Sequence, residues 1–159
     1  MSYTPRPGDY GVVKTNGIVA KLIRLGTLSR WNHAVICIEG DLIVEARPIG
    51  VSFGKASSYD HIAWNQHETL TKDQRSKIVD YAVAQIGKPY GFRDIFTIFL
   101  RILGLRIPPV KLWNKLSKRE GFICSELVAE AYDTASFTLI NKPLNLVTPG
   151  DLAERLIYQ

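Results

Sequence analysis

Two neighbouring runs of β-forming residues constrain the fold more than any other part of the sequence. The run "HAVICI" begins at His33 and the run "DLIVEA" ends at Ala46, with "EGD" at their junction. Short runs rich in Val and Ile on either side of a glycine are typical of an antiparallel β-hairpin. We therefore predict that residues 33–46 form a hairpin at the centre of a small sheet.

The register of this hairpin decides whether two polar residues can meet. Cross-strand partners share a face of the sheet, so His33 and Glu45 face the same way only if paired positions sum to an even number. A three-residue loop at Glu39–Asp41 meets that condition and pairs Val35 with Glu45, which is the arrangement we predict. A two-residue loop at 40–41 would place the two side chains on opposite faces.

Strand patterns lie mainly in the first part of the chain and helical patterns in the later part. Strands are indicated at "DYGVVKT" and "HIAWN". Helices are indicated at "GIVAKLIRLG", after the capping-box sequence "TKDQ", along 92–105, along "CSELVAEAY" and after "TPGD". This order is typical of an α+β fold, and the length of 159 residues favours one domain over 1–159.

Composition limits the environment in which the protein works. Two cysteines do not make a disulfide framework, which favours a reducing compartment. The start of the chain has no secretory pattern, and the most apolar segment is interrupted by Arg101 and Arg106, so we expect neither export by a signal peptide nor a spanning helix. The cytoplasm is the default expectation. The net charge of +5 comes with no zinc-finger or RNP pattern, which disfavours nucleic acid as a partner.

Cys124 is the first candidate for chemistry, because it stands where the helix in "GFICSELVAEAY" begins. A helix N-terminus offers unpaired N–H groups and a partial positive charge, and both favour a thiolate. The same position also suits a small buried filler residue. The sequence around Cys124 is consistent with either role.

His33 and Glu45 strengthen the chemical interpretation. A cysteine nucleophile needs a general base, and a histidine base is usually oriented by a third group on its other ring nitrogen. Glu45 lies between Val44 and Ala46, where an unpaired carboxylate would be costly. Glu45 could serve His33, or it could pair with Arg47.

The sequence resembles the circularly permuted branch of the NlpC-type papain-like superfamily, which includes YiiX-type proteins and relatives of lecithin:retinol acyltransferase. The resemblance is carried by six motifs in family order, which are "RPGD", "NHAVI", "IVEA", "GKPYG", "CSELVAEAY" and "TPGDL". It implies a small antiparallel sheet packed against the helix that carries the cysteine. It also implies that Cys124 is the nucleophile, His33 the base and Glu45 the orienting residue, with Tyr90 near the oxyanion.

The activity implied by this resemblance is that of a thiol amidase or peptidase that needs no metal or organic cofactor. The implied substrate is an amide of peptidoglycan-type peptides or a related small amide. A lipid acyl hydrolase or acyltransferase is the alternative enzyme, and a binding module without turnover is the alternative outside enzymes. The sequence departs from the family pattern at Asn32, Ile123 and Gly91, which leaves the substrate open.

Several other residues have simpler interpretations. Cys37 is expected to be core, because it lies about 13 Å along the strand from His33. A zinc site that combines these cysteines and histidines would lack metal-like spacing, and His61 and His67 are expected to face solvent. The stretch 92–119 is apolar with basic residues near its end, which suits either a helix packed on the sheet or a membrane-touching flap.

Overall fold

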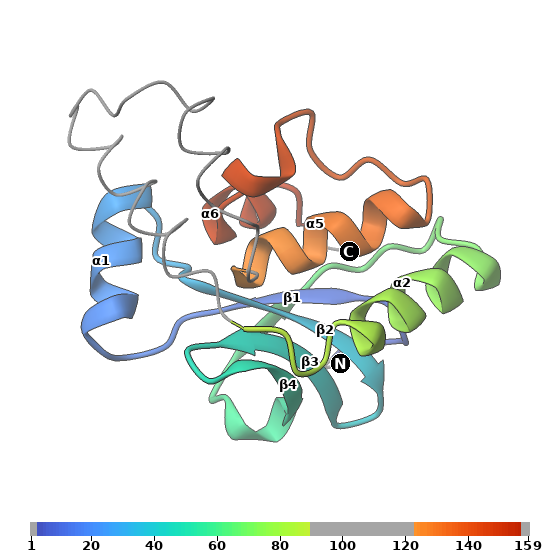
Figure 1. Ribbon diagram of the computed structural model, residues 1–159, viewed down its shortest axis with the longest axis horizontal. Helices are drawn as coiled ribbons and strands as arrows, with labels where there is room; N and C mark the ends of the chain where they lie inside the picture. The colour runs from blue at the N-terminus through green and yellow to red at the C-terminus, as the bar shows by residue number, and fades with distance from the viewer. Residues whose placement is uncertain (1–2, 90–122, 157–159) are drawn as a thin grey trace.

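The computed structural model describes residues 3–89 and 123–156, which form an antiparallel sheet with helices packed on it (Figure 1). The sheet contains β1 (Tyr10–Val13), β2 (His33–Glu39), β3 (Leu42–Arg47), β4 (Gly50–Lys55) and β5 (Ile62–Trp64). Its strand order is β4-β3-β2-β1-β5, and every neighbouring pair is antiparallel. The α+β class expected from the sequence is therefore confirmed.

The β2–β3 hairpin has the predicted pairing but not the predicted loop. Val35 pairs with Glu45, as expected, and Cys37 pairs with Ile43. The pairing nearest the turn is Glu39 with Leu42, so the loop contains only two residues, and the register shifts between Cys37 and Glu39. A β-bulge accommodates one extra residue in β2 and restores the even register. The expectation of a three-residue loop was wrong, whereas the pairing that depended on it is correct.

Two of the described helices begin at the capping signals seen in the sequence. The described helices are α1 (Ile18–Thr27), α2 (Lys72–Ala84), α5 (Cys124–Thr134) and α6 (Pro149–Ala153), with short 3-10 turns η1 (Ala56–Ser58) and η2 (Leu144–Leu146). Thr71 and Gln74 form a reciprocal capping box at the start of α2. Thr148 forms another with Asp151, and Pro149 is the first residue of α6.

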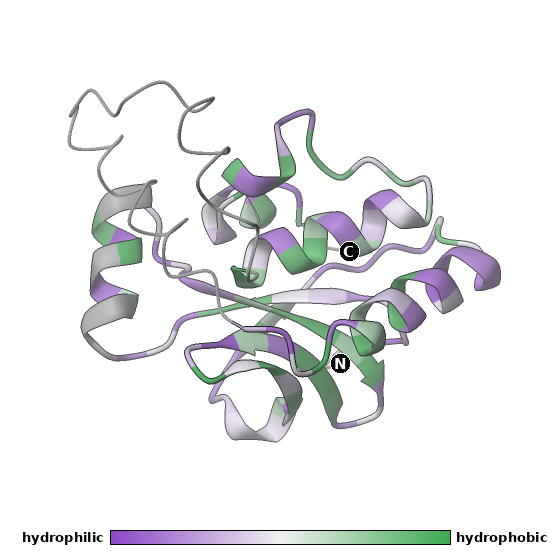
Figure 2. Ribbon diagram, viewed as in Figure 1, coloured by the Kyte–Doolittle hydropathy of each residue, from purple (hydrophilic) through white to green (hydrophobic). Residues whose placement is uncertain are grey.

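The main core lies between the sheet and α5. Helix α5 packs on β2 and β3, and α2 packs beside α5. Hydrophobic residues concentrate on the central strands, and α2 presents polar residues outward (Figure 2). Ile78 and Ala82 of α2 are buried, as expected, but Val83 and Ile86 are each exposed by more than a third, so the apolar face of α2 is narrower than the sequence pattern suggested.

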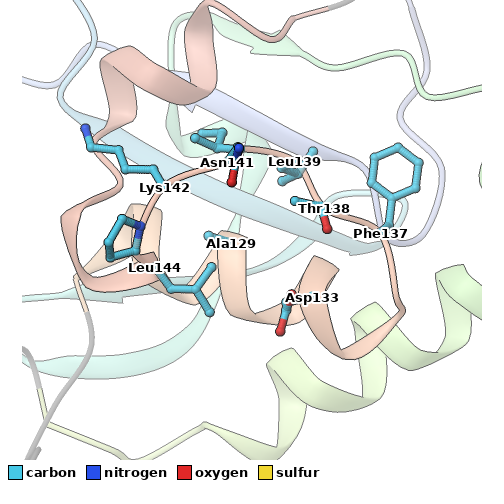
Figure 3. Close-up of a pocket in the computed structure, with 10 residues that line it drawn as sticks. Ala129, Asp133, Phe137, Thr138, Leu139, Asn141, Lys142 and Leu144 are labelled. Atoms are coloured by element: carbon cyan, nitrogen blue, oxygen red, sulfur yellow. The ribbon is translucent and has the colours of Figure 1, made fainter.

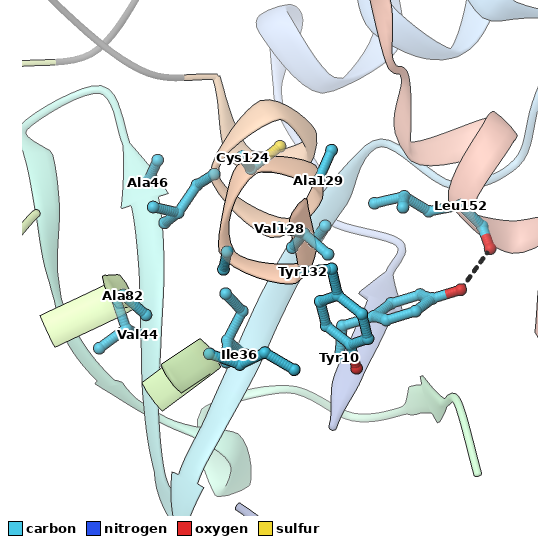
Figure 4. Close-up of a cluster of buried hydrophobic side chains, with 14 of the residues drawn as sticks. Tyr10, Ile36, Val44, Ala46, Ala82, Cys124, Val128, Ala129, Tyr132 and Leu152 are labelled. Atoms are coloured by element: carbon cyan, nitrogen blue, oxygen red, sulfur yellow. Dashed lines mark hydrogen bonds between the residues drawn. The ribbon is translucent and has the colours of Figure 1, made fainter. Parts of the chain in front are cut away.

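The C-terminal segment is fastened to the core by buried hydrogen bonds. The Tyr10 hydroxyl donates to the carbonyl of Leu152 at 3.0 Å, and Ser125 Oγ donates to the carbonyl of Val147 at 2.6 Å. Figure 4 shows the Tyr10 bond among the buried side chains, with Cys124 at one end of α5. These bonds hold the start of α5 in a fixed position over the sheet.

Two expectations fall on residues that the structure does not describe. The helix predicted along 92–105 and the flap predicted along 92–119 lie outside the described ranges. Within residues 3–89 and 123–156, no helix is long and apolar enough to cross a membrane.

Candidate functional site

His33 and Glu45 form a buried pair at the end of the β2–β3 hairpin. The even register places both side chains on one face of the sheet, and His33 Nε2 lies 2.7 Å from Glu45 Oε2. The glutamate is 2% exposed and the histidine 7% exposed. Both groups are thus held away from water, where a hydrogen bond between charged partners is strong.

The Cys124 side chain is the second partner of the His33 ring. Interaction with this side chain is among the causes that raise the pKa of His33, and since Nε2 is bonded to Glu45, Nδ1 is the ring nitrogen left for a further partner. Burial by itself would lower the pKa of His33, but the hydrogen bonds and charges of Cys124 and Glu45 outweigh it and raise that pKa from 6.5 to about 9. The imidazole therefore stays protonated at neutral pH, between two groups that can carry negative charge.

Helix α5 presents Cys124 as its first residue. The preceding residue, Ile123, has extended backbone angles, and no described side chain caps the helix. The first N–H groups of a helix have no acceptor within the helix itself. Those near Cys124 can therefore donate to a negatively charged oxygen, and the positive end of the helix dipole adds to the attraction.

Tyr59 and Arg47 complete the environment of the Glu45 carboxylate. The Tyr59 hydroxyl donates to the oxygen that also accepts from His33, and Arg47 Nε lies 3.4 Å from Oε1. Burial alone would raise the pKa of Glu45, but the bonds from His33 and Tyr59 and the charge of Arg47 hold it below its usual value. Burial, and next the bond to Glu45, raise the pKa of Tyr59 far above its ordinary value, so this tyrosine remains a neutral donor.

Gly54 leaves the space that the carboxylate occupies. It lies on β4, paired with Ile43, and a Cβ built on it would come within 2.2 Å of Glu45 Oε1. A glycine inside a strand often marks such a close approach. The glutamate can lie flat against β4 only because position 54 has no side chain.

Asn32, the residue before His33, forms hydrogen bonds with Thr15 in the loop between β1 and α1. Its Nδ2 donates to Thr15 Oγ1 at 2.6 Å, and its Oδ1 accepts from the Thr15 backbone N–H at 2.9 Å. The sequence showed only that Asn32 departs from the family pattern. The structure shows that it fixes the entry of β2 on which His33 lies.

The other residues considered in the sequence analysis lie in the core, on the surface or outside the described ranges. Cys37 is fully buried, and burial raises its pKa to about 11, which agrees with a core role. His61 is exposed, as expected. His67 is 5% exposed among aromatic rings that include Phe137, so the expectation that it faces solvent was wrong. Tyr90 lies outside the described residues, and its role stays a prediction.

Sequence reasoning missed Tyr59 and Gly54. Both depend on β4 and the turn after it, which the sequence pattern did not indicate as part of the sheet. The sequence did contain one signal for further residues, which was the carboxylate expected in the core. A buried carboxylate needs more hydrogen-bond donors than one imidazole supplies. That signal indicates a missing donor but does not identify it.

Two of the cavities in the described part of the chain are lined by different elements. One, of about 370 Å³, is lined by His33, Asn32, Arg47 and Tyr59 together with residues of α1 and the loop before it. Another, of about 330 Å³, lies between α5 and the loop at 137–144, with Asp133 and Phe137 at its border (Figure 3). Only the first of these two includes residues of the His33–Glu45 pair.

Comparison with known proteins supports the fold and little beyond it. No family model and no curated protein matches the sequence. Among solved structures, the chain is similar to the crystal structure of the metalloprotein YiiX (DUF1105) from Escherichia coli O157:H7, with a TM-score of 0.61 and 19% identity. The similarity covers 84% of this chain and 67% of that one. This chain therefore has a YiiX-like fold.

The described residues do not fit a bound metal ion. Within residues 3–89 and 123–156, no group of three or more His, Cys, Asp or Glu side chains could hold one. In the His33–Glu45 pair, the imidazole Nε2 and one carboxylate oxygen are already bonded to each other. These side chains are therefore arranged for hydrogen bonding to one another.

Proposed function

We propose that the protein is a cysteine hydrolase of the permuted papain-like type, with Cys124 as nucleophile, His33 as base and Glu45 as the residue that orients His33. One observation carries the proposal. A single buried imidazole is bonded through Nε2 to a carboxylate, and the thiol of Cys124, at a helix N-terminus, is among the groups that raise the pKa of that imidazole. Hydrolases that use a thiol nucleophile need these three groups in this order.

The mechanism follows from the proton positions. His33 holds the proton of the thiol, and the Cys124 sulfur attacks the carbonyl carbon of an amide or ester. The carbonyl oxygen becomes an oxyanion that accepts hydrogen bonds from N–H groups at the start of α5. His33 then gives its proton to the leaving amine or alcohol, which leaves a thioester on the sulfur.

Water completes the cycle. Neutral His33 takes a proton from the attacking water, the thioester breaks, and the carboxylic acid product leaves as the thiol is regenerated. Glu45 remains ionised throughout and stabilises the imidazolium. No step in this cycle is routed through a metal ion, because the described residues offer no site for one.

The proposed substrate is an amide of peptidoglycan-type peptides or a related small amide, as the resemblance in sequence implies. A lipid acyl hydrolase or acyltransferase is the second candidate. It is favoured by exposed apolar side chains, with Ile49, next to the cavity-lining Pro48, 81% exposed and Leu28 at the C-terminal end of α1 91% exposed. Mass spectrometry of the acyl-enzyme after incubation with cell-wall fragments and with phospholipid would identify the donor from the mass left on Cys124.

Alkylation with iodoacetamide tests the proposed thiol chemistry. In the wild-type protein, the proposal predicts that the labelling rate at Cys124 changes by less than about twofold between pH 7 and pH 8.5, because transfer of the thiol proton to His33 would supply the nucleophile. In the His33→Gln variant the rate should rise about tenfold per pH unit below pH 8, as for an ordinary thiol. Cys37 should stay unlabelled in both proteins and serves as the internal control.

The result that contradicts the proposal is equally direct. If Cys124 of the wild-type protein shows the pH dependence of the variant, the histidine does not activate it. The binding-module interpretation then replaces the hydrolase, since the fold would keep its cavity without a reactive nucleophile.

A further inference from the structure

The cavity beside His33 has an apolar wall and a polar rim. Ala20 and Ile23 of α1 and Pro48 after β3 line the wall, while His33 and Arg47 contribute the polar groups. With a volume of about 370 Å³, the cavity is at the small end of the range for ligand pockets. It is large enough for one amino-acid-sized group attached to a carbonyl held at Cys124.

The permanent charge on the described lining of this cavity is positive. Among the described residues that line it, Arg47 is the only permanently charged side chain, and none is a carboxylate. The Glu45 carboxylate lies behind the lining, 2% exposed and bonded to His33. Such a cavity attracts an anionic group and repels a cationic one.

Arg47 has donors available for a ligand. Its Nε faces Glu45 Oε1 at 3.4 Å, and in the described part of the chain its two terminal nitrogens have no hydrogen-bonding partner. The side chain is 43% exposed. A guanidinium held at one nitrogen presents the others in a planar fork that matches a carboxylate.

The strand register places Arg47 close to the reacting groups. Val35 pairs with Glu45, so extending this register by two residues brings Arg47 opposite His33 on the same face of the sheet. Arg47 is therefore the positively charged side chain nearest to His33 along the strand pair, and both residues line the cavity.

The wall opposite Arg47 is fixed by hydrogen bonds. The Thr15 carbonyl accepts from Arg24 at 2.7 Å, and its hydroxyl and N–H bond to Asn32. The loop before α1 is thus bonded to both α1 and β2. A fixed wall keeps the distance between His33 and the far end of the cavity constant, which is what discrimination by length requires.

We propose that this cavity receives the acyl part of the substrate and that Arg47 selects acyl donors that carry a free carboxylate a few bonds from the reacting carbonyl. The inference deepens the proposed hydrolase function and rests on it for the identity of the nucleophile. It does not require that turnover be observed, because an alkylating reagent can probe the same geometry.

The test uses N-bromoacetyl derivatives of glycine, β-alanine and γ-aminobutyric acid, each compared with its primary amide. In every reagent the Cys124 sulfur forms a bond to the bromoacetyl carbon and bromide leaves. The paired reagents differ only in the charge at the far end. We expect the carboxylate of at least one length to label Cys124 about tenfold faster than its amide, the size of one charge-assisted hydrogen bond.

Substitutions assign this preference to Arg47. The ratio of carboxylate to amide rates should fall close to one in Arg47→Gln and should be partly kept in Arg47→Lys. The exposed Lys72, at the start of α2, provides the matched control, because Lys72→Gln removes one positive charge far from the cavity. Using the ratio cancels any change in the reactivity of Cys124 that the loss of Arg47 causes.

Two results would overturn the inference. An equal ratio in wild type and Arg47→Gln would show that Arg47 does not recognise the carboxylate. A larger advantage for N-bromoacetyl-aminoethylphosphonate than for the carboxylate of equal length would assign the cavity to phosphate-type groups instead. Failure of the hydrolase proposal is visible separately, in the pH dependence and His33 dependence of labelling with the neutral amides.

Discussion

At the scale of single residues, the Glu45 carboxylate is the group around which its neighbours are arranged. His33 and Tyr59 share one oxygen, Arg47 faces the other, and Gly54 leaves the space between the strands. A buried carboxylate is tolerated only when each lone pair finds a donor. Changes to its neighbours should therefore act on His33 through Glu45.

The substitution Gly54→Ala tests this arrangement. The new methyl group would stand 2.2 Å from Glu45 Oε1, so the carboxylate must move away from His33. We expect the free energy of unfolding to fall by about 1–3 kcal/mol, as for other overpacked sites. The alkylation rate of Cys124 at pH 7 should fall as well. Chemical denaturation and iodoacetamide labelling measure the two effects.

Ser52 supplies the control on the same strand. It lies opposite Glu45 in the β3–β4 pairing, and its buried hydroxyl has no hydrogen-bond partner within residues 3–89 and 123–156. Removing an unpaired buried hydroxyl costs little or stabilises, so Ser52→Ala should leave both measurements nearly unchanged. Equal losses in Ser52→Ala and Gly54→Ala would mean that β4 is merely sensitive to change.

Three site residues, His33, Glu45 and Cys124, could be placed from the sequence. Tyr59 and Gly54 could not. The run that carries His33 and Glu45 has a β pattern, and Cys124 begins a helix with clear amphipathic spacing. Tyr59 and Gly54 lie in "GVSFGKASSY", where Ser and Gly interrupt the hydrophobic alternation that indicates a strand. Their contribution depends on tertiary contacts that no local pattern records.

At the scale of secondary-structure elements, the bond pair between Asn32 and Thr15 connects β2 to the loop before α1. Substituting Asn32→Ala leaves two buried or half-buried polar groups of Thr15 without partners. We expect a loss of about 1–3 kcal/mol in the free energy of unfolding and slower labelling of Cys124, since the entry of β2 orients His33.

The conservative change Thr15→Ser separates the hydrogen bond from the packing. It keeps the hydroxyl that accepts from Asn32, so labelling of Cys124 should stay close to wild type. If Asn32→Ala labels as fast as Thr15→Ser, the link is structural only and does not position His33.

The hairpin shows why element boundaries were easier to predict than the connection between the strands. The β patterns located both strands, and the even register was required if His33 and Glu45 were to meet. A two-residue loop with a bulge between Cys37 and Glu39 satisfies the same requirement as a three-residue loop. Loop length alone therefore does not fix register when a strand can bulge.

At the scale of the whole molecule, acid sensitivity should depend strongly on His67. This ring packs against Tyr132 and Phe137, and neither of its nitrogens has a hydrogen-bond partner among the described residues. Burial, only partly opposed by the charge of Asp9 and aided by that of Arg75, lowers its pKa. The folded protein thus prefers the neutral ring.

The sign of the pH effect follows from this preference. Above the ordinary pKa of 6.5 both states hold a neutral His67 and no stability is lost. As the pH falls below 6.5, the unfolded chain takes up a proton that the folded chain resists, so stability declines until the lowered pKa is reached. We expect His67→Phe to remove this decline and to be stabilised relative to wild type at pH 5.

Chemical denaturation between pH 5 and pH 8 measures the free energy of unfolding of wild type and of His67→Phe. The Glu45 carboxyl has a pKa below its ordinary value of 4.5, so its effect appears below that pH and is common to both proteins. The exposed His61 is the control, and His61→Gln should keep the wild-type slope. If the free energy of unfolding falls with decreasing pH as steeply in His67→Phe as in wild type, another group is responsible for the acid sensitivity.

The global fold was only partly accessible from the sequence. The succession of early strands and late helices was enough for the α+β class, because it depends on local patterns alone. The strand order β4-β3-β2-β1-β5 was not, since β5 pairs with the free edge of β1 rather than with its neighbour in sequence. That choice is made by long-range packing.

The order of the elements along the chain has a consequence for synthesis. The five described strands end at Trp64, so all of them are synthesised before Cys124, the proposed nucleophile. Domains tend to form from the N-terminal side as they emerge, so the imidazole and the carboxylate can pair on a nascent sheet that still lacks its thiol. The proposed nucleophile would then join a base that is already oriented.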